Sequence, residues 1–278
     1  HCAEANAASS MTLHSERNWV LGRPQTAPCP ARHSNLGGTG PDAGPEMMLF
    51  TRVGTQANGA AFDVLIVEAR GPYATRRDQR SPTIAPISDL SALNGCADTA
   101  NGPLGRIRIG QTATIGQSDN SGSATAGQSR PREPPMRLVP FRMRFVDSST
   151  GAPVTLASTY LSFLDIDQGM DEGVTLRELI SVSGFESYVL ADDTRLTVAR
   201  DTQHTSQPAQ PTTGPQWRMP TTFISGGGAV MDPTDPMALD DLQRAHSVTL
   251  FFRGVSEIDF ELGSVAPLTS GRTFYFAG

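Results

Sequence analysis

The clearest evidence for the fold is the stretch Leu138-Val139-Pro140-Phe141-Arg142-Met143-Arg144-Phe145-Val146-Asp147. Its two phenylalanines and the methionine between them alternate with two arginines, so one face of the segment is apolar and the other is charged. Successive side chains of a β-strand point to opposite faces, and strict alternation therefore indicates a strand with one buried face. The stretch predicts a strand that covers a core on one side and meets solvent on the other.

Similar short segments recur along the chain between turn-forming residues. The 278 residues include 27 glycines and 21 prolines, and only 18% of them are charged, which is typical of short strands joined by many loops. These segments predict an all-β fold, an antiparallel β-sandwich resembling a jelly roll, with one short helix and long loops. The other expected strands are Met47–Val53, Phe62–Glu68, Leu104–Ile109, Ser158–Asp167, Leu176–Ser183, Ser187–Leu190, Arg195–Ala199, Thr221–Ser225, Ser247–Arg253, Glu257–Leu262 and Thr273–Phe276.

The domain organisation follows from where apolar periodicity is found. Residues 1–34 have little of it and are expected to form an N-terminal arm or cap, whereas residues 35–278 form a single β-sandwich domain. Two stretches inside this domain, near residues 111–135 and 201–216, are too polar to be buried and are expected to be surface loops. A helix is expected after Asp235, which can cap it, with Pro236 at its first position.

Charge and composition exclude several classes of function. The formal net charge is −6 and no basic stripe is present, which argues against nucleic-acid binding. No apolar run approaches the roughly 20 residues of a membrane-spanning helix. The chain has no lysine, which excludes lysine nucleophiles and Schiff bases, and it has no Gly-x-Ser-x-Gly sequence for a serine nucleophile. A non-enzymatic protein is therefore expected.

The three cysteines indicate an oxidising compartment. Cys29 lies among prolines, Cys96 lies in the turn-like sequence Asn94-Gly95-Cys96, and Cys2 is near the start of the chain. They lack the spacing of a zinc site. One disulfide and one spare thiol are expected, with Cys2–Cys29 and Cys29–Cys96 as the alternative pairings.

Acidic residues concentrate around Phe163-Leu164-Asp165-Ile166-Asp167-Gln168-Gly169. If strand alternation continues to Asp167, the two aspartates point the same way and lie about 7 Å apart. Carboxylates that close need a cation, arginines or open water to stay ionised. Hard oxygen ligands are those that Ca²⁺ prefers, so the sequence predicts a calcium-stabilised loop. The candidate ligands are Asp165, Asp167, Asp171 and Asp232, together with Asn35 and Asp42 from a glycine-rich loop.

Other interpretations of these acids remain open. Arginine partners such as Arg142 or Arg144 are the main rival to calcium, and a solvated edge strand is another. An EF-hand is not expected, because a loop counted from Asp167 has acids at positions one, five and twelve but glycine at position three.

Two further kinds of site are conceivable from single residues. Trp217 is a candidate for stacking against a glycan, although only 6% of the chain is aromatic. His1, expected to be a processed N-terminus, could chelate copper with a second histidine in a brace like that of polysaccharide monooxygenases. His14, His33, His204 and His246 are available as the second ligand, and Tyr275 as an axial one, but an accidental start of the chain explains His1 more simply.

A wider pattern joins Phe163-x-Asp165-x-Asp167, Val182-Ser183-Gly184-Phe185 and Asp232-Pro233-Thr234-Asp235-Pro236-x-x-Leu239. Over about residues 35–278, this pattern resembles uncharacterised secreted β-rich surface proteins of algae and other protists. The resemblance implies an extracellular location without a known activity.

Together these observations predict a secreted, non-enzymatic structural or adhesive component of a cell-surface or extracellular assembly. Its expected partners are other copies of itself or surface glycoproteins, and glycans are further candidates. A carbohydrate-binding module is the alternative function, and a copper-dependent polysaccharide oxygenase is a remote one.

Overall fold

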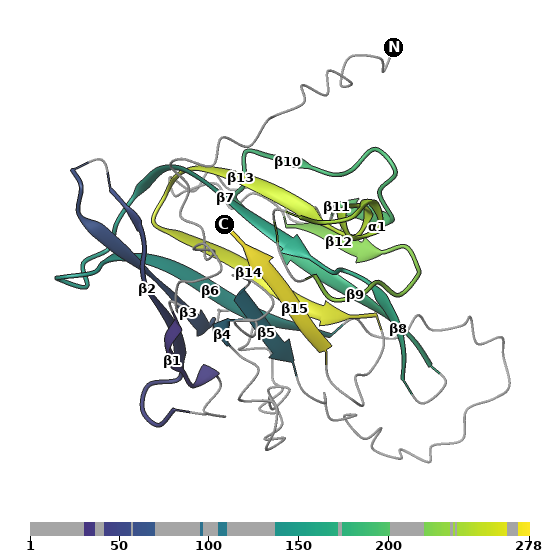
Figure 1. Ribbon diagram of the computed structural model, residues 1–278, viewed down its shortest axis with the longest axis horizontal. Coiled ribbons are helices and arrows are strands. Elements are labelled where there is room, and N and C mark those ends of the chain that lie inside the picture. The colour runs from purple at the N-terminus through teal and green to yellow at the C-terminus, as the bar shows by residue number, and fades with distance from the viewer. Residues whose placement is uncertain are drawn as a thin grey trace, which may run out of the picture.

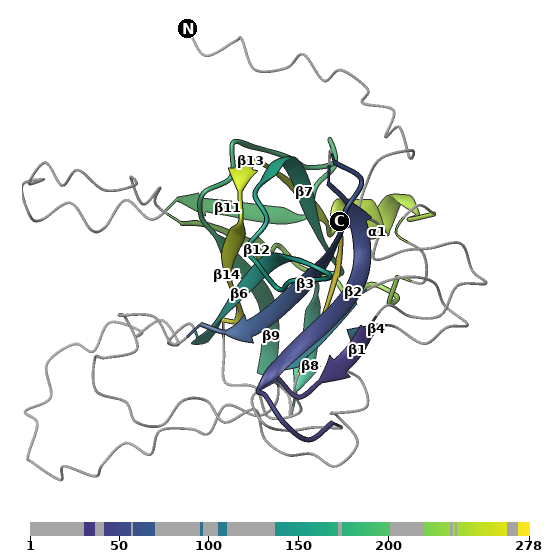
Figure 2. The same ribbon diagram turned by 90° about the vertical axis from the view of Figure 1, so that its left-hand side faces the viewer.

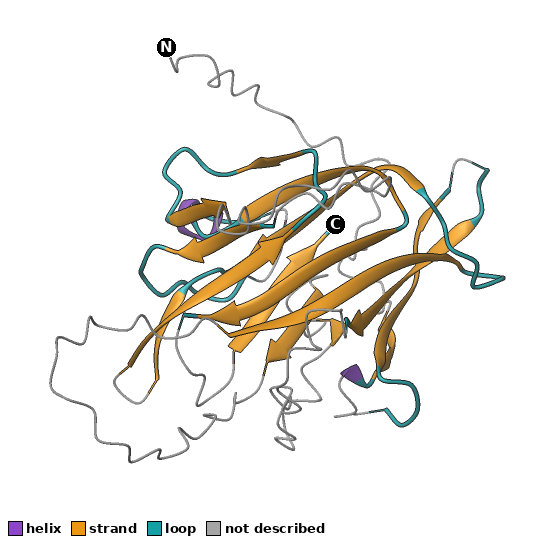
Figure 3. Ribbon diagram, turned by 180° about the vertical axis from the view of Figure 1, so that it is seen from behind, coloured by secondary structure: helices purple, strands orange, loops and turns teal. Residues whose placement is uncertain are grey.

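The protein is seen in a computed structural model, in which most strands lie in two facing antiparallel layers (Figure 1). The structure describes residues 31–36, 42–56, 58–69, 95–96, 105–109, 137–171, 174–200, 220–233, 236, 238–265 and 272–278. The polar loops near 111–135 and 201–216, Trp217, Cys2 and Cys29 lie outside these residues. Strands dominate the described part, with helix confined to short pieces (Figure 3). The predicted all-β sandwich is confirmed.

The larger sheet has nine strands, and every pairing in it is antiparallel. Its order brings β14, the last strand but one in the chain, between β6 and β9, with β8 paired to β9 beside the main path. In spatial order the strands are β1 (Ala31–Ser34), β2 (Met47–Thr55), β3 (Ala61–Glu68), β6 (Arg137–Asp147), β14 (Glu257–Ser264), β9 (Val174–Val182), β12 (Thr221–Ser225) and β11 (Leu196–Arg200), with β8 (Gln168–Asp171) at the side.

The smaller sheet has six strands and is also antiparallel. The helix α1 (Asp241–Ala245) lies on the side of the molecule away from β14 and β6, as Figure 2 shows. In spatial order the strands are β10 (Ser187–Val189), β13 (Val248–Val255), β7 (Leu156–Leu164), β15 (Arg272–Ala277), β5 (Gly105–Ile109) and β4 (Gly95–Cys96).

The core lies between the two sheets and is rich in phenylalanine. Phe163 of β7 packs against Phe260 of β14 with ring centroids 5.4 Å apart, and Phe50 of β2 meets Phe276 of β15 edge to face at 6.0 Å. Gly105 allows β5 to approach this layer, since a Cβ there would come 2.5 Å from the ring of Phe276. Large aromatic side chains contribute most to burying apolar area, so these contacts hold the two layers together.

The alternation predicted for β6 is confirmed in three dimensions. Phe141, Met143 and Phe145 are fully buried, whereas the two arginines between them face outward. Arg142 makes a bidentate hydrogen-bonded ion pair with Asp259 at 2.7 and 2.9 Å. The two arginines predicted as rival partners of the acidic loop form ion pairs with other acids. Arg142 pairs with Asp259 and Glu257, and Arg144 pairs with Glu257.

Several element boundaries differ from the predictions. The last four residues of the predicted arm form β1 and pair with β2, and Cys96 lies in the strand β4 rather than in a turn. The helix does not begin after Asp235. Asp240 caps it instead, through a capping box with Gln243, because the Asp240 side chain accepts from the Gln243 N–H while the Gln243 side chain accepts from the Asp240 N–H.

Candidate functional site

The strand that carries the two aspartates ends earlier than predicted. β7 stops at Leu164, and Asp165 has a backbone φ of 62°, in the left-handed region that aspartate tolerates better than most residues. Asp165 and Asp167 are therefore not side by side on one strand face, and the prediction of a strand through Asp167 is wrong. The chain turns into β8 instead, and the N–H of Ile166 donates to the carbonyl oxygen of His246 at 2.9 Å.

The aspartates nevertheless meet other acids in a buried cluster between the sheets. Asp165 and Asp167 each keep only 7% of their surface exposed, and Glu178 of β9 keeps 2%. The Glu178 carboxylate accepts the N–H of Asp167 at 3.3 Å. We call Asp165, Asp167, Glu178 and Asp232 the carboxylate cluster; Asp232 joins it from the exposed segment after β12 and acts electrostatically on both buried aspartates.

Burial and mutual repulsion raise the pKa values of the buried acids in this cluster. Burial, followed by repulsion from Asp167 and Asp232, raises the pKa of Asp165 to about 8. Burial also raises the pKa of Asp167, although the N–H of Val230, which donates to its Oδ2 at 3.0 Å, acts in the opposite direction. The pKa of Glu178 lies well above its ordinary value, mainly because the side chain is buried. The folded protein therefore favours protonation of Asp165, Asp167 and Glu178.

Arg272, at the start of β15, provides positive charge for the cluster. Its Nε lies 3.8 Å from Glu178 Oε1, and its attraction opposes the pKa increase of Asp165, Asp167 and Glu178. The guanidinium group fits because residue 169 is glycine: a Cβ there would come 1.5 Å from an Arg272 nitrogen. Arg272 is thus the arginine nearest to Glu178, and it is a different arginine from Arg142 and Arg144.

Asp232 is held by the smaller sheet. The Tyr275 hydroxyl donates to Asp232 Oδ2 at 2.7 Å, and burial together with this hydrogen bond raises the pKa of Tyr275. Asp167 and Asp232 thus anchor the segment after β12 at two points, one through Val230 and one through Tyr275. Among the predicted ligands, the structure brings Asp165, Asp167 and Asp232 together.

Two of the remaining predicted ligands, Asn35 and Asp42, lie apart from this group. Asn35 and Asp42 brace their own loop: the Asn35 side chain donates to the carbonyl of Gly44 at 2.8 Å, and Asp42 accepts the N–H of Ser34 at 2.7 Å. This loop follows β1, across the width of the molecule from β8 in Figure 1. Asp171 ends β8, and its side chain lies outside the described part. In the part of the chain that the structure describes, no three acidic, histidine or cysteine side chains form a group that could hold a metal ion.

The histidines considered for copper have other surroundings. Buried His246 places Nδ1 3.1 Å from the carbonyl oxygen of Ile166, and the ring of His33 contacts the carbonyl oxygen of Pro45 at 2.8 Å. Tyr275 is bonded to Asp232. His1, His14 and His204 lie outside the described residues, so the histidine brace stays a prediction.

Two members of the site, Glu178 and Arg272, are absent from the predicted ligands, and Glu178 enters the sequence analysis only as position twelve of the rejected EF-hand loop. A signal for Glu178 was present, because it shares the parity of Leu176, Ile180 and Val182, the buried face of β9. A carboxylate on an apolar face needs a partner, and a partner could have been sought among the arginines. Nothing local to Arg272 indicated which arginine that would be.

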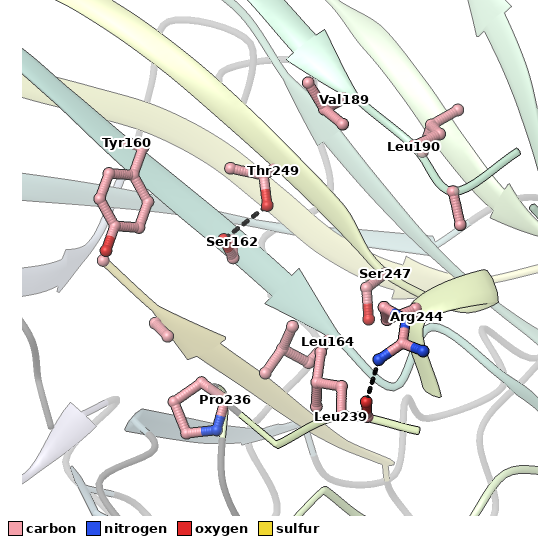
Figure 4. A pocket seen from close by; sticks show the side chains of 13 residues that line it. Tyr160, Ser162, Leu164, Val189, Leu190, Pro236, Leu239, Arg244, Ser247 and Thr249 are labelled. Carbon is pink, nitrogen blue, oxygen red and sulfur yellow. Dashed lines mark hydrogen bonds between the residues drawn. The ribbon is translucent and has the colours of Figure 1, made fainter. Parts of the chain in front are cut away.

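A separate pocket opens on the outer face of the smaller sheet (Figure 4). Its volume is about 350 Å³, and its wall combines apolar side chains with hydroxyl groups. Ser162 and Thr249 share a hydrogen bond of 2.7 Å in it, and Arg244 of α1 is bonded to the carbonyl of Leu239 and to Asp241. The lining consists of Tyr160, Ser162, Leu164, Val189, Leu190, Ala191, Pro236, Leu239, Arg244, Ser247, Thr249, Ala277 and Gly278. No member of the carboxylate cluster lines this pocket.

Comparisons with known proteins leave the chain without a family. No family model matches it, and no curated protein matches it. Among solved structures, the N-terminal domain of the Streptococcus gordonii adhesin Sgo0707 is similar, with a TM-score of 0.42 and 9% sequence identity. The match covers 85% of this chain and 48% of that one, so the chain spans about half the length of the adhesin structure. A likeness this distant assigns neither family nor function. In the described part of the chain, the helix is too short to cross a membrane.

Proposed function

We propose that the protein is a non-enzymatic extracellular module that acts by binding, as an adhesive or structural component of a cell surface or extracellular assembly. The observation that carries this proposal is the composition of the pocket wall. Among the described residues, the wall offers apolar surface, hydroxyl groups and an arginine already paired with Asp241, and no carboxylate, histidine or cysteine side chain that could act as acid, base or nucleophile lines it. A pocket of this composition is suited to recognition rather than to chemistry.

The ionisable groups of the molecule support the same conclusion. Asp165 and Glu178, whose pKa values burial raises strongly, are buried members of the carboxylate cluster and do not line the pocket. Perturbed acids in a cleft are typical of catalytic sites, but acids enclosed by their own fold lack access to a substrate. We therefore propose a structural role for the cluster and a binding role for the pocket.

The rim of the pocket gives a direct test. Val189 lines it and is 55% exposed, whereas Leu242 on α1 is similarly exposed, at 49%, and does not line it. Val189→Asp introduces a charge into the contact surface, and Leu242→Asp is the matched control. With glycan arrays and immobilised wild-type protein as probes, we expect Val189→Asp to weaken binding at least tenfold and Leu242→Asp to leave it within about twofold. Equal binding by both variants, or no binding of either probe by the wild type, contradicts the proposal.

A carbohydrate-binding module is the second candidate. The pocket favours this function because the ring of Tyr160 lines it together with the hydroxyl groups of Ser162 and Thr249, as Figure 4 shows. Binding to glycans alone, with no self-association in sedimentation experiments, supports this alternative over a component that assembles with its own copies.

A further inference from the structure

The outer face of the smaller sheet carries a pair of arginines without acidic neighbours in the sheet. Arg106 and Arg108 of β5 alternate with buried residues and therefore point to the same side, away from the core. On β15, Arg106 lies opposite Tyr275 and Arg108 lies opposite Thr273, and on β4 Arg106 lies opposite Gly95. None of these three neighbours has a carboxylate. We call Arg106 and Arg108 the β5 arginine pair.

The same Arg-x-Arg pattern on β6 is neutralised by acids. Arg142 Nε lies 2.7 Å from Asp259 Oδ1, and Arg144 Nε lies 3.6 Å from Glu257 Oε2 on the neighbouring β14. By contrast, the Nε of Arg106 is buried and has no hydrogen-bond partner among the described residues. A buried donor without a partner is unfavourable, so the sheet leaves Arg106 with a hydrogen bond that a ligand can complete.

Positive charge prevails around the β5 arginine pair. Burial lowers the pKa of Arg108, and repulsion from Arg272 acts in the same direction. Tyr275 and Asp232 oppose this decrease, but Asp232 is a single carboxylate and already accepts the Tyr275 hydroxyl at 2.7 Å. Arginine keeps its proton in proteins, so a bound oxyanion would relieve repulsion that the described residues leave in place.

We propose that the β5 arginine pair binds the carboxylate or sulfate group of an acidic glycan. Guanidinium groups donate hydrogen bonds in a planar fork that matches such oxyanions. Side chains two residues apart on one strand face begin about 7 Å apart, so both guanidinium groups can reach one acidic group. The formal net charge of −6 repels polyanions, which favours a glycan with a single acidic group over nucleic acid or a highly sulfated polymer.

This inference rests on the proposed function, because it names the class of glycan that the adhesive module takes. The pocket opens on the same face of the smaller sheet, although neither arginine lines it. Its lining residues Leu164 and Ala277 pack with Tyr275, which lies opposite Arg106. The acidic group and the uncharged sugars of one glycan thus have adjoining places on this face.

The test compares calorimetric binding of 3′-sialyl-lactose, which carries one carboxylate, 3′-sulfo-lactose, which carries one sulfate, and neutral lactose. We expect the wild type to bind at least one acidic probe about tenfold more tightly than lactose, and the preferred probe identifies the acidic group. Arg106→Gln removes the charge and is expected to bring that preference to within about twofold. Arg253→Gln is the matched control, because Arg253 lies on β13 of the same sheet and pairs with Glu186 at 3.1 Å; it should keep the wild-type preference.

A second measurement observes the arginine directly. In ¹⁵N-labelled wild type, the Nε–H signal of Arg106, assigned by its loss in Arg106→Gln, should shift with sodium sulfate and not with sodium chloride of the same ionic strength. An unmoved signal overturns the inference, and so does equal affinity of the wild type for the three probes. A sulfate response without binding of either acidic probe also overturns it, because the ligand would then not be an acidic glycan.

Failure of this inference is distinguishable from failure of the proposed function. If Val189→Asp weakens binding of all three probes while Arg106→Gln keeps the acidic preference, the pocket proposal stands and the β5 arginine pair is not the site. If Arg106→Gln loses the acidic preference while Val189→Asp and Leu242→Asp bind equally, the arginine pair is supported and the pocket proposal fails.

Discussion

Replacing Asp165 with asparagine removes a buried ionisable carboxyl group while nearly preserving the shape of the side chain. The backbone φ of 62° is no obstacle, because asparagine is one of the residues that accept the left-handed region. The pKa of Asp165 is raised from 3.8 to about 8 in the folded state. The variant therefore tests whether the Asp165 carboxyl lowers the free energy of unfolding, and whether this effect grows with pH.

The direction of the pH dependence follows from comparing the proton affinity of Asp165 in the folded and the unfolded chain. Below about pH 4 Asp165 is protonated in both the folded and the unfolded chain, so it does not lower the free energy of unfolding at that pH. As pH rises from about 4 toward 8, the unfolded chain has lost the proton and the folded one retains it, so the free energy of unfolding decreases by up to about 1.4 kcal/mol per pH unit. At pH 7 this amounts to an upper limit of about 4 kcal/mol, reduced by any readjustment of Asp167 and Arg272.

Urea denaturation followed by circular dichroism at several pH values between 4 and 8 measures this effect. We expect Asp165→Asn to match the wild type at pH 4 and to exceed its free energy of unfolding by about 1–4 kcal/mol at pH 7. The exposed Asp192→Asn is the control and should stay within about 0.5 kcal/mol of the wild type at both pH values. A difference between Asp165→Asn and wild type that is the same at pH 4 and pH 7 would refute the reasoning, because the buried charge would then not be its cause.

Three further substitutions test the contacts around the cluster and the core by urea denaturation. Gly169→Ala places a Cβ against the guanidinium group of Arg272 and is expected to cost about 1–3 kcal/mol; an unchanged stability would show that the arginine does not occupy this position. Tyr275→Phe removes the hydrogen bond to Asp232 and is expected to cost about 1–2 kcal/mol, and a neutral result would mean that the bond is not formed in solution. Phe163→Ala opens a cavity between the sheets and is expected to cost about 3–5 kcal/mol, so a loss below about 1 kcal/mol contradicts its central place in the core.

Most strands of this protein can be predicted from the alternation of apolar residues along the chain. Strand alternation is a local property, since each residue chooses a face by its position alone, and β6, β5 and β12 follow their predicted patterns almost to the residue. Strands in which the alternation of apolar residues is weak are predicted less accurately. β1 and β4 are four and two residues long and are stabilised by pairing with β2 and β5, a contribution that no window of sequence contains.

The composition of the candidate site depends on contacts between segments that are far apart in the sequence. The strand order places β14 between β6 and β9, and it brings β15 beside β7, more than 100 residues away in the chain. The β15–β7 pairing carries Arg272 to the two aspartates, whereas Glu178 meets them through the neighbouring β8–β9 pairing, in which Gln168 lies opposite Arg177. The left-handed backbone at Asp165 then ends the alternation that the sequence seemed to continue. Local periodicity specifies which side chains are buried, whereas the choice of counter-charge depends on contacts between distant segments, which form only when the sheets assemble.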